Sequence, residues 1–319
     1  MKILLFKSVF CPNNVYYEKT ISSMVKINIF FELLARKGID VQYSVHYVGW
    51  IGSHAKQFDQ WVGVNVSAVK PTHVYQTLWP INYGKYKIFN HMIDTIRSDP
   101  LYDLVIYMDH DIHFDFNTID MFEHLIAIPE EIPDGSPDRV SVSVPVSVSV
   151  SVSVGVPDAT QSRPLIRLGM IGLNQSGDNR HSPDIMAHTS AYGQLQLCWP
   201  SHIGAIASGG FMMFPSVLGA MRHFDLVDVY GLDDYWFDKQ LAESNHRNLV
   251  VGNVYVVHDH DTNTRYGAWK KNKVLRLIGS MGSIELMGSM VDSSADSMAV
   301  GGSSEYYNRV QESMNFWVV

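Results

Sequence analysis

The segment Asp109-His110-Asp111 places two carboxylates and an imidazole directly after a short apolar run. This run, residues 104–108, is partly β-branched and ends in charge, which predicts a buried strand of a parallel sheet. In open α/β sheets, ligands bind at the carboxyl ends of the strands. Two carboxylates at such an end can converge on one divalent cation and leave positions open for substrate phosphates. Because aspartate pairs are also common in solvated loops, the position after a strand carries this prediction.

Two adjacent acids, Asp233 and Asp234, begin a predicted helix over residues 233–244. Acids at a helix N-terminus often serve only as caps and as partners of the helix dipole. Here they have aromatic neighbours, which partly desolvate a carboxylate and raise its basicity, and aromatic faces suit the apolar faces of sugars. These neighbours are Tyr230, Tyr235, Trp236 and Phe237. The pattern therefore predicts a general base.

A third group of polar residues, which includes His258 and His260, follows the apolar run 248–257. Histidine readily joins carboxylates around a manganese-like ion, so one of these imidazoles is expected near Asp109 and Asp111. A single histidine at a strand end is more often structural, but here further charged residues lie close to His258 and His260 in the sequence. They are Asp259, Asp261, Arg265, Lys270 and Lys271.

Strands and helices that would position these groups alternate along the chain, which predicts an α/β fold that opens as a βαβ unit. Gly38 lies where a helix C-cap belongs, and Asp99-Pro100 ends the predicted helix before the strand at 104–108. The predicted strands cover 2–10, 38–48, 104–108, 205–214 and 248–257, and the predicted helices cover 20–37, 84–97 and 233–244.

Composition limits the class of protein. A chain of 319 residues with 46% hydrophobic and 18% charged residues can bury a full core and fits one large domain with or without appendages. Its 24 basic and 32 acidic residues give a formal charge of −8, which repels a phosphate backbone and argues against general nucleic-acid binding. A phosphate ligand would therefore need a local cation.

Cysteine content and the first residues bear on the compartment. Cys11 and Cys198 are too few for a disulfide framework, so we expect two reduced thiols and a cytoplasmic location. The apolar start, residues 1–10, is about half the length of a membrane span and lacks a cleavage site, which favours a strand over a signal peptide. We expect no transmembrane segment.

Low-complexity segments interrupt and follow the predicted core. Residues 141–156 repeat Ser-Val almost without exception and are interpreted as an insertion without chemistry. Residues 276–304 are rich in Gly, Ser and Met, which predicts a linker, and residues 305–319 are a C-terminal segment that could dock as a helix or strand. Such segments suit the genome of a large virus, in which case the location would be the host cytoplasm.

The order of five motifs resembles the GT-A glycosyltransferases, most like the inverting family 2 type. The motifs are NYGKYKIFNHMIDTI, LVIYMDHDI, SGGFMMF, YGLDDYWF and VVHDHD. The resemblance implies one GT-A-like domain over 1–275, with a mostly parallel central sheet, flanking helices, and a Rossmann-like nucleotide-binding half beside an acceptor half. In the family pattern an Asn-X-Gly stretch precedes a helix with a second asparagine, which matches Asn82, Gly84 and Asn90.

The remaining motifs carry the chemistry that the resemblance implies. The D-X-D pair matches Asp109 and Asp111, and a late histidine that completes the metal site matches His258. A Gly-Gly strand that lines the acceptor side matches Gly209-Gly210. An E-D motif, whose aspartate is the base, matches Asp233-Asp234.

Three departures from the family pattern leave alternatives open. Asp233 replaces the usual Glu, so either acid of that pair could be the base, and His260 competes with His258 for the metal. The segment 10–14 lacks the usual phrase that grips the nucleotide base, so the donor nucleotide is not predicted.

The resemblance implies a metal-dependent inverting glycosyltransferase that moves a sugar from a nucleotide-diphosphate-sugar donor to a hydroxyl of a glycan acceptor. A manganese or magnesium ion would be held by Asp109, Asp111 and His258, and Asp234 or Asp233 would be the base. Donor binding is assigned to Asn82, Lys85, Asp109, His110, Gly209, Gly210, Arg265 and Lys270. The alternatives are a retaining enzyme of the same fold, which needs no base beside the acceptor, and a non-catalytic carbohydrate or nucleotide-sugar binding module.

Overall fold

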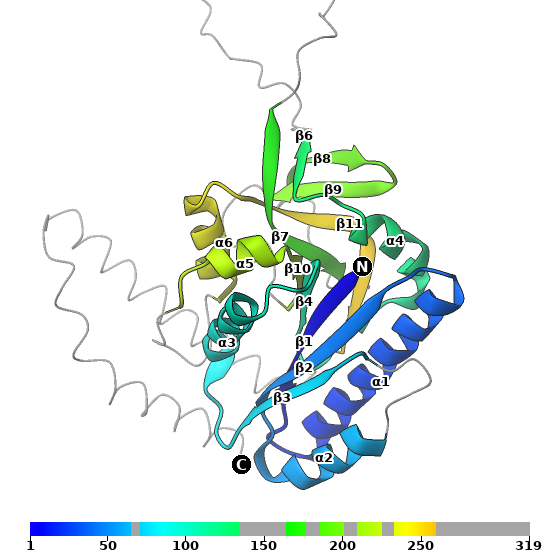
Figure 1. Cartoon of the computed structure of the whole chain (residues 1–319), viewed down its shortest axis with the longest axis vertical. Helices are drawn as coiled ribbons and strands as arrows, with labels where there is room; N and C mark the ends of the chain where they lie inside the picture. Colours follow the sequence, from blue (N-terminus) through cyan, green and yellow to red (C-terminus); the bar gives the residue numbers. More distant parts are fainter. Residues whose placement is uncertain (65–70, 134–163, 176–185, 201–208, 225–232, 260–319) are drawn as a thin grey trace, which may run out of the picture.

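The computed structural model describes residues 1–64, 71–133, 164–175, 186–200, 209–224 and 233–259 (Figure 1). The strands are β1 (Lys2–Phe10), β2 (Gln42–Trp50), β3 (Val74–Trp79), β4 (Leu104–Met108), β5 (Ile112–Phe114), β6 (Glu131–Pro133), β7 (Leu165–Gln175), β8 (Met186–Tyr192), β9 (Leu195–Pro200), β10 (Gly210–Met213) and β11 (Arg247–His258). The helices are α1 (Asn14–Arg36), α2 (Ala55–Val64), α3 (Gly84–Ser98), α4 (Ile119–Ile126), α5 (Pro215–Ala220) and α6 (Asp233–Glu243). Two 3₁₀ turns are η1 (Gly52–His54) and η2 (Phe116–Thr118).

These strands form a sheet in the order β3-β2-β1-β4-β10-β7-β11-β9-β8, with β5 paired to β11 and β6 to β7. Pairing is parallel from β3 through β2 and β1 to β4, and again between β7 and β11. Strand β10 inserts antiparallel between β4 and β7, and β9 and β8 continue the sheet in antiparallel pairs. The predicted α/β fold with a central sheet and flanking helices is confirmed.

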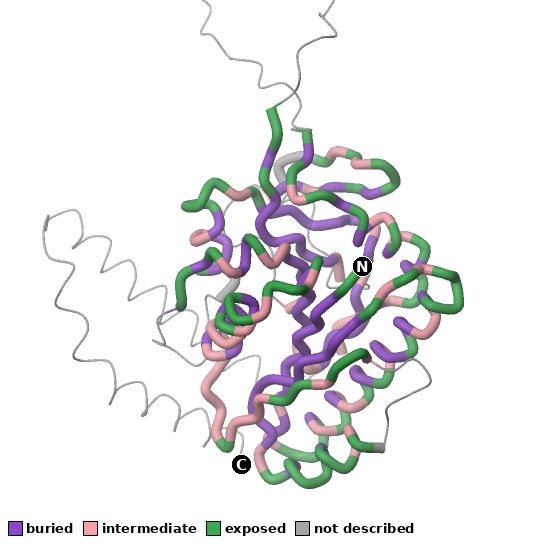
Figure 2. The backbone as a smooth tube through the Cα atoms, viewed as in Figure 1, coloured by how far each residue is buried: buried purple, intermediate pink, exposed green. Residues whose placement is uncertain are grey.

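Apolar side chains cover both faces of the sheet and make two cores. One core packs α1, α2 and α4 against the sheet, with Phe30, Phe58 and Phe122 buried in it. The other packs α3, α5 and α6 against the opposite face, with Phe89 and Phe237 buried. Figure 2 shows the central strands as the most continuously buried part of the chain. This burial on both faces explains why β1 and β4 read as near-continuous apolar runs.

Element boundaries differ from the predictions where local caps decide them. Helix α1 begins at Asn14 rather than at residue 20, because the Asn13 side chain accepts the Tyr16 N–H at 3.3 Å as an N-cap. Gly38 has a φ of +81°, as expected of a residue that follows a helix end. Strand β2 is buried on both faces, and not only on the one predicted from its alternation.

Several elements were not anticipated from the sequence, namely α2, α4, α5, β3 and β5 to β9. The predicted strand at 205–214 is described only from residue 209, and β10 occupies 210–213. The Ser-Val repeat at 141–156, the linker at 276–304 and the segment 305–319 lie outside the described residues. No helix in the described ranges has the length and apolar character needed to span a membrane.

Candidate active site

A tight turn at the carboxyl end of β4 brings the D-X-D segment against β11. The Ile112 N–H donates to the Asp109 carbonyl at 3.1 Å, and the chain then re-enters the sheet as β5. Strand β5 pairs with β11 in a register that sets Ile112 opposite His258. Asp259, the next residue, donates its backbone N–H to the Asp111 carbonyl at 3.1 Å. The pairing therefore delivers His258 to the acids from a point far along the chain.

Asp111 is the acid that meets the late histidine. Its Oδ2 lies 3.3 Å from His258 Nε2 and 3.7 Å from His110 Nε2, and its side chain is 8% exposed. Burial alone would raise the pKa of Asp111. The charge of His110, the hydrogen bond and charge of His258 and the charge of Lys7 together outweigh burial and hold this pKa below its usual range. The carboxylate is therefore ionised at neutral pH.

The His110 ring packs against two aromatic rings. Its ring centroid is 5.3 Å from that of Phe10 and 5.7 Å from that of Tyr16. The Nε2 atom is buried and donates to or accepts from no hydrogen-bond partner within the described chain, although it faces Asp111. Burial lowers the pKa of His110, and the charges of Asp111 and Asp109 act to raise it.

Asp109 faces the other way. Its Oδ1 accepts the Tyr107 hydroxyl at 2.6 Å, and its Oδ2 lies 3.1 Å from Lys85 Nζ at the start of α3. The structure therefore does not bring all three predicted metal ligands together: Asp111 and His258 meet, whereas Asp109 pairs with Lys85. Within the described residues, no three His, Cys, Asp or Glu side chains are close enough to form a metal site by themselves.

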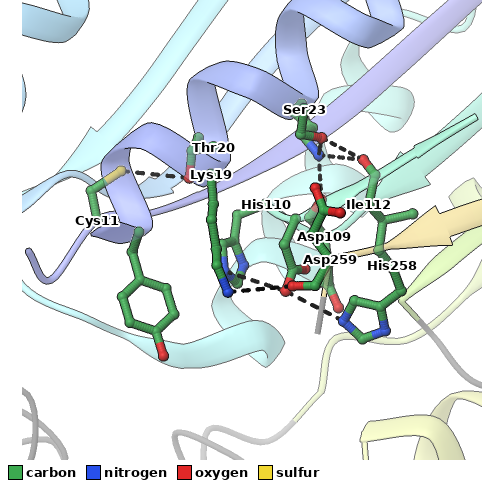
Figure 3. A network of polar contacts seen from close by, with 12 residues as sticks. Cys11, Lys19, Thr20, Ser23, Asp109, His110, Ile112, His258 and Asp259 are labelled. Atoms are coloured by element: carbon green, nitrogen blue, oxygen red, sulfur yellow. Dashed lines mark hydrogen bonds and ion pairs between the residues drawn. The ribbon is translucent and has the colours of Figure 1, made fainter. Parts of the chain in front are cut away.

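Lys7 is a site residue that none of the sequence motifs predicted. It is fully buried in β1, and its Nζ donates to Ser23 Oγ at 2.7 Å, to the Ile112 carbonyl at 2.7 Å and to the Asp109 carbonyl. Figure 3 labels these three partners. The Ser23 hydroxyl donates to the same Ile112 carbonyl at 2.6 Å. Burial lowers the pKa of Lys7 to about 7, against the opposing charge of Asp111. A lysine inside an otherwise apolar strand was the available signal.

Three of the residues matched to the family motifs have local structural roles. Asn82 Oδ1 accepts the Gly84 N–H at 2.9 Å, and Gly84 begins α3 with a φ of +77°, which favours glycine. Asn90 is bound in both directions to the backbone of Phe224, at 2.8 and 2.7 Å, and so ties α3 to the segment after α5.

The Gly-Gly pair lies beside the D-X-D turn. The Gly209 carbonyl accepts the Asp109 N–H at 2.7 Å. A Cβ on Gly209 would come within 2.8 Å of Ile112 Cδ1 and 3.3 Å of Asp109 Oδ2, so the Ile112 side chain would have to shift to admit a larger residue. Gly210 is buried in β10, where a Cβ would make only ordinary contacts.

The structure describes the two acids predicted as the general base only at the backbone. Asp233 and Asp234 form the first turn of α6, and their side chains lie outside the described residues. Helix α6 is anchored by Asp238, which is buried and accepts a hydrogen bond from Asn248 of β11. Outside the described ranges lie His260, Arg265, Lys270 and Lys271.

Two lysines of α1 reach the same region. Lys19 Nζ donates to the Asp259 carbonyl at 3.4 Å, and Lys26 Nζ lies 3.5 Å from Asp259 Oδ2. Figure 3 shows Lys19 extending from α1 toward Asp259. Lys85 thus contacts Asp109, whereas Lys19 and Lys26 contact Asp259, the residue that follows His258. Lys19 was not predicted from any motif, because the α1 helix precedes the D-X-D segment by many residues.

Comparison with known proteins identifies the fold. No protein-family model matches the sequence, and no curated protein matches it either. Among solved structures, the mannosyltransferase PcManGT from Pyrobaculum calidifontis, in complex with GDP-Man and Mn²⁺, has a TM-score of 0.50 at 10% identity, over 98% of this chain and 68% of that chain. The chain has a GT-A fold.

Further solved structures match over less of their own length. Residues 1–349 of TarS from S. aureus match with a TM-score of 0.43 and 11% identity, over 80% of this chain and 60% of that chain. GalNAc-T7 with UDP, GalNAc and Mn²⁺ matches with a TM-score of 0.46 and 11% identity, over 81% of this chain and 44% of that chain. The chain therefore spans less than two thirds of these two structures.

The donor atoms of this GT-A site suit a divalent cation. Asp111 supplies a buried, ionised carboxylate and His258 an imidazole nitrogen that faces it at 3.3 Å. Magnesium prefers oxygen ligands, whereas manganese accepts imidazole together with carboxylate, so the pair fits manganese better than magnesium. Two protein ligands are sufficient for an ion whose other positions are taken by water and substrate phosphates.

Proposed function

We propose that this protein is a metal-dependent inverting glycosyltransferase that uses a nucleotide-diphosphate-sugar donor and a glycan hydroxyl as acceptor. The observation that carries the proposal is the meeting of Asp111 and His258 at the carboxyl end of β4, inside a GT-A fold. The ligand end of such sheets and the donor atoms agree with this assignment. The complex of PcManGT with GDP-Man and Mn²⁺ supports a nucleotide sugar and a divalent metal.

In this proposal Asp111 and His258 hold the ion, and the chain around them fixes its position. When bound by these two residues, the ion would supply positive charge to the donor diphosphate. Lys7 and Ser23 bind the carbonyl of Ile112 and so fix the turn from behind. Asp109 holds Lys85 at 3.1 Å, which places an ammonium group on the donor side of the turn.

Proton transfer is assigned to the first turn of α6. Asp234 takes the proton from the attacking hydroxyl, a role typically worth about 10²–10⁴ in rate. Attack from the side opposite the leaving diphosphate inverts the anomeric centre. Asp233, the neighbouring acid, is the natural control because it shares the helix turn and the chemistry but not the role.

The first experiment asks whether a donor binds at all. The full chain is screened by thermal shift against UDP- and GDP-sugars with and without manganese, and a donor at 100 times its Kd should add about 2.7 kcal/mol of stability. The stabilisation should require manganese and should disappear in Asp111→Asn. If no nucleotide sugar stabilises the protein in either condition, the proposal is wrong.

The second experiment separates the mechanisms. With an active donor, Asp234→Asn should keep donor and metal affinity while transfer falls by about 10² or more, because the proton acceptor is lost and the shape is kept. Asp233→Asn should transfer sugar at close to the normal rate, and the product should be inverted. A retained anomeric configuration together with an active Asp234→Asn would instead identify a retaining enzyme, and donor binding without any transfer or hydrolysis would indicate a binding module.

A further inference from the structure

A second group of imidazoles lies between α3 and the parallel strands, apart from the D-X-D turn. His46 on β2 and His91 on α3 point their Nε2 atoms at each other, 3.2 Å apart. The Thr77 hydroxyl of β3 lies 2.9 Å from the same His46 nitrogen. In the sheet, β1 separates β2 from β4, so this group does not share residues with the candidate active site.

The geometry of the pair matches two ligands of one tetrahedral ion. Histidine nitrogens bind zinc at about 2.0–2.1 Å, which places two nitrogens of one tetrahedral site about 3.3 Å apart. The two rings are perpendicular, with an interplanar angle of 90° and centroids 4.8 Å apart, so neither ring stacks on the other. Both residues belong to regular elements, so the spacing is fixed by the packing of α3 on the sheet.

Both imidazoles are in the form that can bind a metal. Burial, and after it the charge of His91, lowers the pKa of His46 to about 4. Burial also lowers the pKa of His91, with Asp94 acting to raise it and Lys87 to lower it further. Near neutral pH each ring is therefore uncharged and keeps one nitrogen lone pair.

The surroundings limit the kind of ion. Within the described chain, no third His, Cys, Asp or Glu completes a cluster around the pair. The ligand set is thus two nitrogens with a neighbouring hydroxyl and water, which suits zinc, nickel or copper and does not suit the oxygen-seeking magnesium. The ring of Tyr75, 5.7 Å from that of His46, and the ring of Trp79, 6.4 Å from that of His91, flank the pair.

We propose that His46 and His91 bind one zinc ion or a similar transition-metal ion, with Thr77 and water in the remaining positions. The ion would join the middle of α3 to β2. Because Lys85 of the candidate active site lies at the start of α3, the ion would also stiffen the helix that presents this lysine. Without an ion, the pair is a hydrogen bond in which the two rings share one proton.

The experiment measures zinc binding in a protein that lacks the Asp111 ligand. The full chain without a histidine tag is stripped of metal, and Asp111→Asn is titrated with zinc chloride by calorimetry. We expect one zinc ion per chain attributable to the pair, and a loss of affinity of at least tenfold when His91→Ala is added. A matched control is His124→Ala, which removes an imidazole from α4 on the opposite face of the sheet.

The outcomes are distinct from those for the glycosyltransferase. If Asp111→Asn and its double variant with His91→Ala bind zinc equally, or if neither binds it, the pair is only a shared-proton hydrogen bond and the proposal fails. His46→Gln provides a second test, because it should lower zinc affinity as much as His91→Ala. Loss of sugar transfer in Asp111→Asn has no bearing on this result, and zinc binding at the pair has none on the transfer assay.

Discussion

The two acids of the D-X-D segment lie two residues apart, but they belong to different halves of the site. The Asp109 carboxylate faces α3, where Tyr107 donates to one oxygen and Lys85 lies 3.1 Å from the other. The Asp111 carboxylate faces β11, where His258 approaches to 3.3 Å. One acid is therefore held by protein partners, and the other stands where it can bind an ion.

The turn at the end of β4 causes this difference. In a continuous strand, side chains two residues apart point to the same face. Here the Ile112 N–H donates to the Asp109 carbonyl at 3.1 Å, so the chain reverses between the two acids. The D-X-D spacing therefore fixes where the acids lie along the chain, while the turn decides which acid lies next to His258.

The largest effect is expected for Asp111→Asn. The amide keeps the shape of the carboxylate but loses the charge that binds a dication. Because a bound metal contributes several kcal/mol to stabilising transition-state charge, transfer should fall by about 10³-fold or more. Donor binding with and without manganese, measured by calorimetry, should become independent of manganese.

An exposed acid provides the matched control for this change. Asp120→Asn, on the surface of α4, should leave transfer and manganese dependence unchanged, since its side chain is 72% exposed. The metal-free Tm of Asp111→Asn should stay close to that of the unchanged protein. A fall of many degrees without metal would show that Asp111 is a structural residue rather than a ligand.

The next effect in size is expected for Lys7→Met, which acts on both acids at once. Methionine fills the buried space but leaves the Asp109 and Ile112 carbonyls without the lysine that binds them. The turn should lose its fixed position, and manganese affinity should fall by about 10–100-fold, as for other residues that orient metal ligands.

The conservative control for Lys7 tests positioning against simple destabilisation. Ser23→Ala removes the second donor to the Ile112 carbonyl and should lower manganese affinity less than Lys7→Met. Manganese affinity is measured at a temperature well below each Tm, so that the folded fraction is equal. If Lys7→Met lowers the Tm and leaves the manganese affinity unchanged, the lysine supports the fold and not the site.

The sequence predicted the elements whose patterns are local. Strands β1, β4 and β11 and helices α3 and α6 were found within about two residues, because apolar runs, Gly and Pro mark them directly. The antiparallel entry of β10, strand β9 and the edge strand β8 were not predicted, since they depend on which distant segments pair. The site residues show the same difference between features set by local sequence and features set by contacts between distant segments.

Among the site residues, the sequence pattern predicted that Asp111 and His258 share one site, and the structure brings them together. It did not predict that Asp109 would turn toward Lys85, because the direction of a side chain in a turn depends on hydrogen bonds that spacing does not encode. It also missed Lys7, whose partners are backbone carbonyls about 100 residues away along the chain, at separations of 102 and 105 residues.

A smaller effect is expected for Asp109→Asn. If Asp109 acts through Lys85 and not on the ion, manganese affinity should change by no more than about tenfold, the lower end for an outer partner. Donor affinity should fall more than manganese affinity, because Lys85 loses the charge that holds it. A loss of manganese affinity as large as that of Asp111→Asn would show that both acids bind the ion, so that Asp109 and Asp111 would have the same role.

The smallest effect is expected for Tyr107→Phe, which removes only the hydroxyl that donates to Asp109 at 2.6 Å. The ring stays in the core, where it packs against Phe89 and Phe211, so the fold should persist. One hydrogen bond is worth about 1 kcal/mol, so donor affinity should fall by roughly fivefold. Manganese affinity should not change, because the hydroxyl lies on the α3 side of the turn.

The pair Tyr107→Phe and Asp109→Asn also forms a double-mutant cycle, in which the tyrosine change should have no further effect once the carboxylate is gone. Additive losses in that cycle would mean that Tyr107 acts on the donor by another route, and a loss of manganese affinity in Tyr107→Phe alone would place Asp109 on the ion.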